Sequence, residues 1–240
     1  MTAPAFSVVV PCYNEADNLP LLLESYRAAW PSEISAELVL VNNGSTDHTA
    51  EVLACELARP EYSFARTVLV PVNQGYGYGV NAGIRQASGE VIGISHADMQ
   101  CPARDLFRAY EALIATGNPR GAFVKGKRGR RGFGASLITN TMAVIASMVL
   151  TTPLTDINAQ PKVFHRSFLE DLRNPPRGFE FDLYLLYRAR EKGLQVLTIP
   201  VEFGARAHGT SKWAFSLLSR WRNVWATVRY IFRLRCSASG

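Results

Sequence analysis

Apolar runs alternate with helical patterns over the first half of the chain, and this alternation constrains the fold more than any other feature. Each run is almost wholly apolar, as are strands buried on both faces of a parallel sheet. The runs read FSVVVP, ELVLVN, RTVLVPV and EVIGIS, and the helical patterns that follow them cover residues 18–30, 45–58, 79–87 and 102–116. The pattern predicts an α/β fold: a Rossmann-like, mostly parallel sheet with helices on both faces.

Size and cysteine usage fit this fold class. The chain has 240 residues, enough for one large domain or two small ones, and its 48% of hydrophobic side chains allow a sizeable core. Its four cysteines show no paired spacing, which argues against a zinc site or a disulfide framework and fits a reducing compartment. The N-terminus, MTAPAFSVVVP, leads directly into a strand pattern, so we expect no signal peptide.

The net charge of +6 is unevenly distributed. Residues 1–111 hold 6 basic and 13 acidic side chains, whereas residues 112–155 and 203–240 hold 6 and 7 basic side chains and no acidic ones. Such blocks suit phosphate groups or an anionic membrane surface, with general solubility as the alternative. No RNA-binding motif or interleaved aromatic stack accompanies them, so we expect no nucleic-acid partner.

Polar loops follow three of the predicted strands and a fourth precedes one helix, and two of these loops, VNNGSTD and NQGYGYG, contain glycines. Ligands of open α/β sheets bind at the carboxyl ends of the strands, where these loops should meet. Glycines allow close backbone approach, and helix starts offer free N–H groups to an anion. A nucleoside diphosphate is therefore the expected occupant. The loops read PCYNEADN, VNNGSTD, NQGYGYG and SHADMQ.

The order and spacing of these loops resemble the family 2 glycosyltransferases, which have the GT-A fold. Later segments resemble the dolichyl-phosphate mannose synthase branch and its bacterial polyprenyl-phosphate relatives, and the resemblance covers about residues 6–215. The later segments are FVKGKRGRRGF, TDINAQPKVFHRSFL, GFEFDLYLLYRARE, LQVLTIPVEF and RAHGTSKW.

The resemblance implies a nucleotide-sugar donor and a divalent metal, Mg²⁺ or Mn²⁺, that bridges its two phosphates. It also implies that Gly75 and Gly77 allow their loop to close on the nucleotide. The implied base and ribose contacts are Pro11, Tyr13, Glu15 and Asn43. The implied metal ligands are Asp98 and Gln100, with His96 as a further candidate for the metal or for the donor.

The chain departs from the family pattern at residues 42, 43 and 96. Asn42 and Asn43 replace a usual Asp pair, and His96 replaces the first Asp of D-x-D. An imidazole suits Mn²⁺ better than Mg²⁺, which prefers oxygen ligands. His96 could instead contact ribose or water without a metal role, and a chain that only binds nucleotide-sugars is a further alternative.

Two basic stretches, KGKRGRR and RAHGTSK, suit an acceptor that is a phosphate monoester. Such a phosphate has a second pKa of about 6, so it is largely a dianion at pH 7 and needs cations rather than a general base. Arg128, Arg206 and Lys212 match positions of the family branch. The full set of expected acceptor-phosphate residues is Lys127, Arg128, Arg131, Arg206 and Lys212, and Arg128 and Asp98 are also expected to be catalytic.

An acceptor hydroxyl would need a general base. Glu180 and Asp182, in GFEFD, are the candidates for that catalytic role. Acidic residues are also favoured at a helix start, so capping is an equal alternative.

The C-terminal stretch has the pattern of a helix lying in a membrane interface. On a helical wheel a broad apolar arc is shared by Trp213, Leu217, Trp221, Val224, Trp225, Val228, Ile231 and Phe232, and Arg222, Arg229 and Arg233 lie opposite. Packing against the domain or a second subunit is the alternative. The apolar segment 136–150 is too short to span a bilayer. We therefore expect a domain at 1–212 and an interfacial helix at 213–240, peripherally bound to the cytoplasmic face of a membrane, with a membrane-protein partner or a homo-oligomer as further options.

Together these features predict an inverting hexosyl- or N-acetylhexosaminyl-transferase. It would move sugar from a nucleotide-sugar to a dolichyl- or undecaprenyl-type polyprenyl phosphate. The alternatives are a hydroxyl acceptor in polysaccharide or secondary-metabolite synthesis, and a non-catalytic nucleotide-sugar-binding protein.

Overall fold

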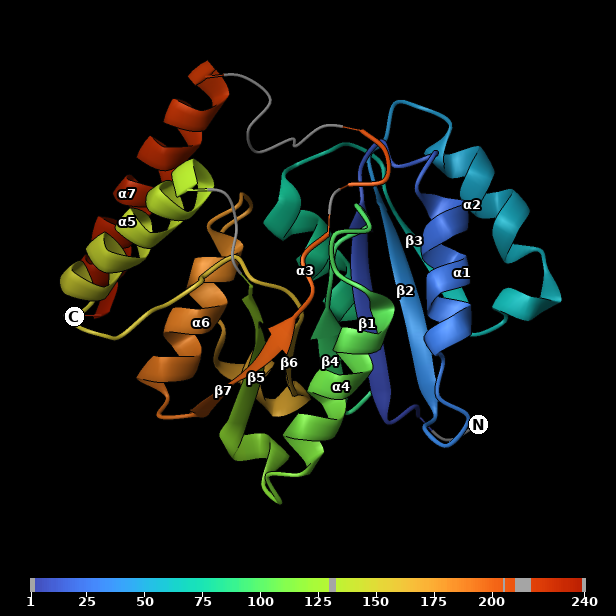
Figure 1. Cartoon of the computed structure of the whole chain (residues 1–240), viewed down its shortest axis with the longest axis horizontal. Helices are drawn as coiled ribbons and strands as arrows, with labels where there is room; N and C mark the ends of the chain where they lie inside the picture. The colour runs from blue at the N-terminus through green and yellow to red at the C-terminus, as the bar shows by residue number, and fades with distance from the viewer. Residues whose placement is uncertain (1–2, 130–132, 205, 210–216, 239–240) are drawn as a thin grey trace.

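A seven-stranded sheet forms the centre of the molecule (Figure 1), in the order β3-β2-β1-β4-β6-β5-β7. The computed structural model describes residues 3–129, 133–204, 206–209 and 217–238. The strands are β1 (Phe6–Cys12), β2 (Ala36–Asn43), β3 (Ala65–Val70), β4 (Val91–Ile94), β5 (Ala122–Arg128), β6 (Lys162–His165) and β7 (Gln195–Val201).

The polarity of the sheet is mostly parallel, as predicted. Strands β1 to β4 pair in parallel, and so do β5 and β7. Strand β6 lies between β4 and β5 and runs antiparallel to both. Its amino end therefore lies at the edge where the parallel strands have their carboxyl ends, and residues just before it reach the same rim as the loops after β1, β2 and β4.

Helices cover both faces of the sheet, which also confirms the prediction. One hydrophobic cluster holds buried side chains of α1, α2 and α4, and the other holds those of α3, α5, α6 and α7. The helices are α1 (Leu19–Ala29), α2 (Thr49–Leu57), α3 (Tyr76–Gln86), α4 (Ala103–Ile114), α5 (Phe133–Val149), α6 (Phe181–Glu191) and α7 (Leu217–Ala238), with 3-10 turns at Pro60–Tyr62, Pro119–Gly121 and Arg166–Asp171.

The C-terminal helix α7 packs beside α5 (Figure 1). Its Ile231 is fully buried in the core, whereas Trp225 is 62% and Phe232 54% exposed. The apolar arc of the wheel is therefore split between the core and the surface. Trp213 lies outside the described residues. Within the described part of the chain, no helix is both long enough and apolar enough to cross a bilayer.

Candidate active site

The loops after β1 and β2 are tied to each other at the sheet rim. Asn14, at a φ of 54°, accepts from the Thr46 backbone N–H at 2.8 Å and donates its own backbone N–H to Ser45 Oγ at 3.1 Å. Pro11, Tyr13 and Glu15 are partly buried in the same loop, next to these hydrogen bonds. The structure therefore places these predicted donor contacts together at the rim, and their contact with a nucleotide stays a prediction.

The start of α3 does not offer the free N–H groups that we expected. Gly77 and Tyr78 donate their backbone N–H groups to the carbonyls of Gly178 and Arg177, at 3.2 and 3.1 Å. A side chain at Gly77 or at Gly75, whose φ is 111°, would collide with backbone atoms of this same segment. The expectation was wrong because the glycines admit residues 176–178, which come from far along the chain.

Asn43 joins this arrangement from β2. It is 2% exposed and donates Nδ2 to the Gly75 carbonyl at 3.1 Å. In this conformation its amide ties two loops together, and a direct contact with the nucleobase or ribose stays a prediction. Asn42 is likewise buried, and its Oδ1 accepts from the Ser45 backbone N–H.

The loop after β4 carries the predicted metal ligands. Asp98 is 5% exposed; its Oδ1 accepts from the Gln100 backbone N–H at 3.2 Å, and its Oδ2 lies 2.8 Å from Arg206 Nη2. Gln100 donates its side-chain amide to the Gly204 carbonyl at 3.1 Å. The structure thus brings together Asp98 and Gln100, predicted for the donor, and Arg206, predicted for the acceptor.

His96, in the same loop, contacts residues that the sequence did not single out. Its Nε2 is 3.2 Å from Tyr76 Oη and 3.4 Å from Gln160 Nε2. Burial lowers the pKa of His96, so the ring is neutral at pH 7. Gln160 comes from the segment before β6, and the reversed strand explains how it reaches the rim.

A buried ion pair lies behind His96. Lys162 Nζ is 2.7 Å from Asp182 Oδ1, and their side chains are 0% and 5% exposed. Burial lowers the pKa of Lys162 and outweighs the attraction of the carboxylate. Asp182 is therefore already engaged, which does not fit the free general base considered for an acceptor hydroxyl. Glu180 is partly buried at the start of α6 and makes no side-chain cap. Lys162 was missed, although a lysine opening an apolar run is a usable signal.

The basic residues that follow position 124 lie in different environments, because strand β5 buries some of them and exposes others. Lys125 is 1% exposed on β5, and burial lowers its pKa to about 8. Lys127 is exposed. Arg128 is held by Asp156, which accepts from its side chain and from its backbone N–H, and its guanidinium lies over the Phe203 ring. Arg128 is thus already paired in this conformation, while Arg131 and Lys212 lie outside the described residues.

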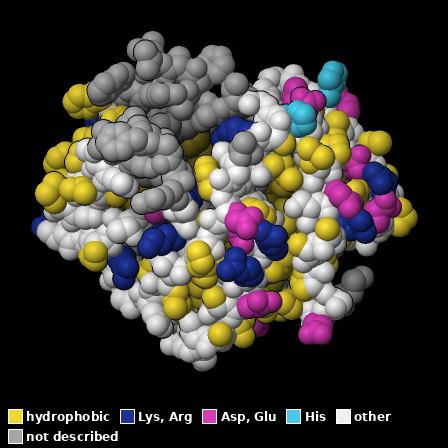
Figure 2. Space-filling view, in the orientation of Figure 1, with side chains coloured by type: hydrophobic (Ala, Val, Ile, Leu, Met, Phe, Trp, Pro, Cys, Tyr) yellow, Lys and Arg dark blue, Asp and Glu magenta, His cyan; other side chains and the backbone are white. Residues whose placement is uncertain are grey.

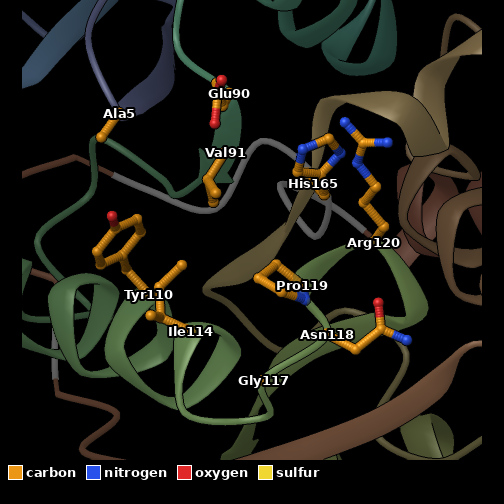
Figure 3. Close-up of a pocket in the computed structure, with 10 residues that line it drawn as sticks. All are labelled: Ala5, Glu90, Val91, Tyr110, Ile114, Gly117, Asn118, Pro119, Arg120 and His165. Atoms are coloured by element: carbon orange, nitrogen blue, oxygen red, sulfur yellow. The ribbon is translucent and has the colours of Figure 1, made fainter.

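A hollow of about 300 Å³ lies at the opposite edge of the sheet (Figure 3). Its lining includes Ala5 and Val91, at the amino ends of β1 and β4, and His165 and Arg120. Because ligands of such sheets bind at the carboxyl ends of the strands, this hollow is separate from the site built around Asp98.

A model of glycosyl transferase family 2 matches residues 7–173. The chain belongs to this family. An uncharacterised glycosyltransferase of Mycobacterium tuberculosis is 33% identical over 222 residues, which cover 90% of this chain and 93% of that protein. The undecaprenyl-phosphate 4-deoxy-4-formamido-L-arabinose transferase of Photorhabdus laumondii is 30% identical over 217 residues, covering 88% of this chain and 64% of that enzyme.

The solved structure of glucosyl-3-phosphoglycerate synthase from M. tuberculosis, in complex with Mn²⁺, UDP and product, has the same fold. Its TM-score is 0.71 at 21% identity, over 98% of this chain and 80% of that one. The predictions of a GT-A fold and of a family 2 glycosyltransferase are therefore confirmed.

Proposed function

We propose that this glycosyltransferase moves a sugar from a nucleotide-sugar to a polyprenyl phosphate at a membrane surface. The ion pair between Asp98 and Arg206 carries the proposal. It places a cation expected to hold the acceptor phosphate 2.8 Å from the carboxylate expected at the donor diphosphate. An acceptor held by Arg206 would meet the donor at the point where the two loops touch.

The donor loop fits a divalent cation that is held partly by the donor itself. Asp98 provides a carboxylate and Gln100 an amide oxygen, ligands that Mg²⁺ and Mn²⁺ accept. The described residues contain no cluster of three or more His, Cys, Asp or Glu side chains suited to a metal. Diphosphate oxygens and water would therefore complete the coordination, as such ions commonly do in nucleotide sites. The ion would supply positive charge to the departing diphosphate.

A phosphate acceptor fits the state of Asp182 better than a hydroxyl acceptor does. A hydroxyl must lose its proton to a base, and Asp182 is buried and paired with Lys162. A phosphate dianion needs no base. Its oxygen would attack the anomeric carbon from the side opposite the nucleoside diphosphate and form the new C–O bond. The bond to the diphosphate would break and its electron pair would leave with the diphosphate, so this in-line displacement would invert the anomeric centre.

A transfer assay tests the proposal. Radiolabelled UDP- and GDP-sugars are offered with undecaprenyl phosphate, with soluble sugars and with neither. We expect label in the lipid fraction only when the polyprenyl phosphate is present. Label on soluble sugars instead would support the hydroxyl-acceptor alternative, and tight nucleotide binding without transfer would support a binding protein.

Arg206→Ala should move two measurements in opposite directions. Removing a half-buried cation from Asp98 frees the carboxylate, and we expect Mn²⁺-dependent nucleotide affinity to rise up to about fivefold, or ~1 kcal/mol. Specificity for the polyprenyl phosphate should fall about ten- to a hundredfold, because a charge-assisted contact is worth roughly 1.5–3 kcal/mol. Isothermal titration and kinetics provide the two values.

The matched control is Arg104→Ala. Arg104 pairs with Glu202 at 2.6 Å and not with Asp98. Glu202 lies close to Arg206 along the chain. It should change neither value. Equal losses of donor and acceptor affinity in Arg206→Ala would place Arg206 at the donor diphosphate.

The surface of α5 and α7 supports membrane attachment as part of the proposal. Val144 and Met148 on α5 are 55% and 67% exposed, and α7, which packs beside α5, carries the exposed Trp225 and Phe232. Hydrophobic side chains are visible in Figure 2 at the left edge, where Figure 1 places these helices. Exposed arginines accompany them on α7, which suits anionic lipid headgroups.

Trp225→Ser combined with Phe232→Ser should weaken binding to vesicles of anionic phospholipid at least about tenfold, because burying a large apolar side chain contributes about 1.5–3 kcal/mol. Sedimentation with vesicles at several salt concentrations measures this. The control is Leu69→Ser with Val72→Ser, which removes two equally exposed apolar side chains at the distant β3 end. Equal effects of both pairs would contradict a specific membrane face on α7.

A further inference from the structure

Three buried amide oxygens at the rim of the sheet have no hydrogen-bond partner among the described residues. They are Asn18 Oδ1 in the loop after β1, Asn43 Oδ1 at the end of β2 and Gln160 Oε1 just before β6. Their side chains are 2%, 2% and 5% exposed. A buried oxygen without a partner costs free energy, so such atoms are rare unless a ligand or water supplies the missing hydrogen. A ligand rich in O–H and N–H groups would therefore suit this rim.

The orientation of the Gln160 amide is fixed by a buried ion pair. Gln160 donates Nε2 to Asp182 Oδ1 at 3.0 Å, and the same carboxylate oxygen accepts from Lys162 Nζ at 2.7 Å. A carboxylate paired with an ammonium group accepts hydrogen bonds and does not donate them, so the amide atom that faces it is the nitrogen. The reversed orientation would bring two oxygens together. Oε1 is therefore the atom that points away from Asp182.

The backbone at Gln160 is held by the neighbouring strand β5. Gly126 donates its backbone N–H to the Pro161 carbonyl at 2.9 Å. A Cβ at Gly126 would lie 2.0 Å from the Gln160 carbonyl oxygen, so only a glycine admits this close approach. Both the backbone and the amide of Gln160 are thus fixed before a ligand binds, and a preorganised group loses little conformational freedom on binding.

The order of the strands places Gln160 beyond the expected position of the diphosphate. In the proposed function the nucleoside lies over β2 and β1, and the diphosphate lies at Asp98, after β4. The next strand in the sheet is β6. Its Lys162 pairs with Ile94, and continuing this antiparallel ladder sets Gln160 opposite His96. The sugar is attached to the far end of the diphosphate, so it would come to the amino end of β6.

We propose that Gln160 is a specificity-determining residue whose Oε1 accepts a hydrogen bond from a hydroxyl group of the donor sugar. The identity of the donor rests on the proposed function. A sugar with this hydroxyl supplies the hydrogen that the buried oxygen lacks, whereas a sugar without it leaves the oxygen unsatisfied. A site built to hydrogen-bond a substrate hydroxyl rejects the analogue that lacks it more strongly than an apolar pocket does.

Isothermal titration of the full-length chain with Mn²⁺ and without acceptor tests this inference. UDP-glucose, GDP-mannose and their monodeoxy analogues are compared with UDP and GDP. We expect one monodeoxy analogue to bind at least about tenfold more weakly than its parent nucleotide-sugar, because it leaves a buried acceptor unpaired. In Gln160→Met this difference should fall to within about twofold, and the affinity for the nucleoside diphosphate should change by less than about twofold, because the lost contact is to the sugar alone.

Tyr76→Phe is the matched control. It removes another neighbour of the same amide, since Tyr76 Oη lies 3.2 Å from Gln160 Nε2, and it leaves Oε1 in place. The variant should discriminate between the sugars as the unsubstituted protein does. Loss of the discrimination in Tyr76→Phe as well would assign the effect to the polar cluster as a whole and contradict a role for Oε1. Thermal unfolding of each variant verifies that the fold is retained.

Two further results would overturn the inference. The first is equal affinity of the unsubstituted protein for every monodeoxy analogue and its parent nucleotide-sugar, a measurement that needs no folded variant. The second is undiminished discrimination in Gln160→Met, which would leave water as the partner of Oε1. In both cases the nucleotide-sugars still bind, so the proposed function stands. Failure of the unsubstituted protein to bind any of these nucleotides would instead contradict the proposed function, and with it the role of Gln160.

Discussion

Asp98→Asn should lower sugar transfer by at least about 100-fold. The change keeps the size of the side chain and removes the negative charge that opposes a cation, and a metal contributes several kcal/mol to charge stabilisation in such reactions. Asp98 is the single carboxylate of ISHADMQ, and its Oδ1 also fixes the turn through the Gln100 N–H. Initial rates at saturating nucleotide-sugar measure the loss.

Glu37→Gln is the matched control for Asp98→Asn. Glu37 also pairs with an arginine, Arg66, at 2.8 Å, but it lies at the start of β2, on the opposite edge of the sheet. It should cost stability and leave turnover unchanged. Undiminished transfer by Asp98→Asn in excess chelator would show that neither the metal nor this carboxylate takes part in the reaction.

Lys162→Met should destabilise the fold by about 3–5 kcal/mol, because it leaves the buried carboxylate of Asp182 without its cation. Both side chains of the pair are almost completely buried, so water cannot replace the lost partner. Urea unfolding followed by circular dichroism measures the change in the free energy of unfolding.

The double variant Lys162→Met with Asp182→Leu should recover most of this loss, since apolar side chains can replace a buried ion pair at little net cost. Lys127→Met, at an exposed position of the neighbouring strand β5, should change stability by less than about 0.5 kcal/mol. A single variant as stable as the parent protein would show that Asp182 is protonated or hydrated in the fold.

The first four strands and their helices could be predicted because each is a local pattern. Strand β6 could not, since it has four residues and opens with a lysine whose burial depends on its contacts with Asp182 and the Ala159 carbonyl. The expectation of free N–H groups at the start of α3 was wrong for a similar reason. Their partners, Arg177 and Gly178, lie about a hundred residues away, and no local pattern reports such a contact.

The candidate site was predicted unevenly. The motifs assigned Asp98 and Gln100 to the donor and Arg206 to the acceptor, and the structure brings these three together. Motif matching gives the position of a residue but not its partner, so the pairing of Arg128 with Asp156 was not foreseen. In the C-terminal helix, the wheel identified an apolar arc without separating Ile231, which the core buries, from Trp225, which it leaves exposed.

The antiparallel course of β6 has a consequence for how such a chain can diverge. Lys162 is registered opposite Ile94, two residues before His96, and Val163 is opposite Gly93. A slip of one residue would turn Lys162 to the other face of the sheet, so the ladder itself fixes the distance between the lysine and the donor loop. The connection between β5 and β6 is not subject to this constraint. Insertions there could reshape the acceptor side over evolutionary time while the inherited register keeps the donor side unchanged.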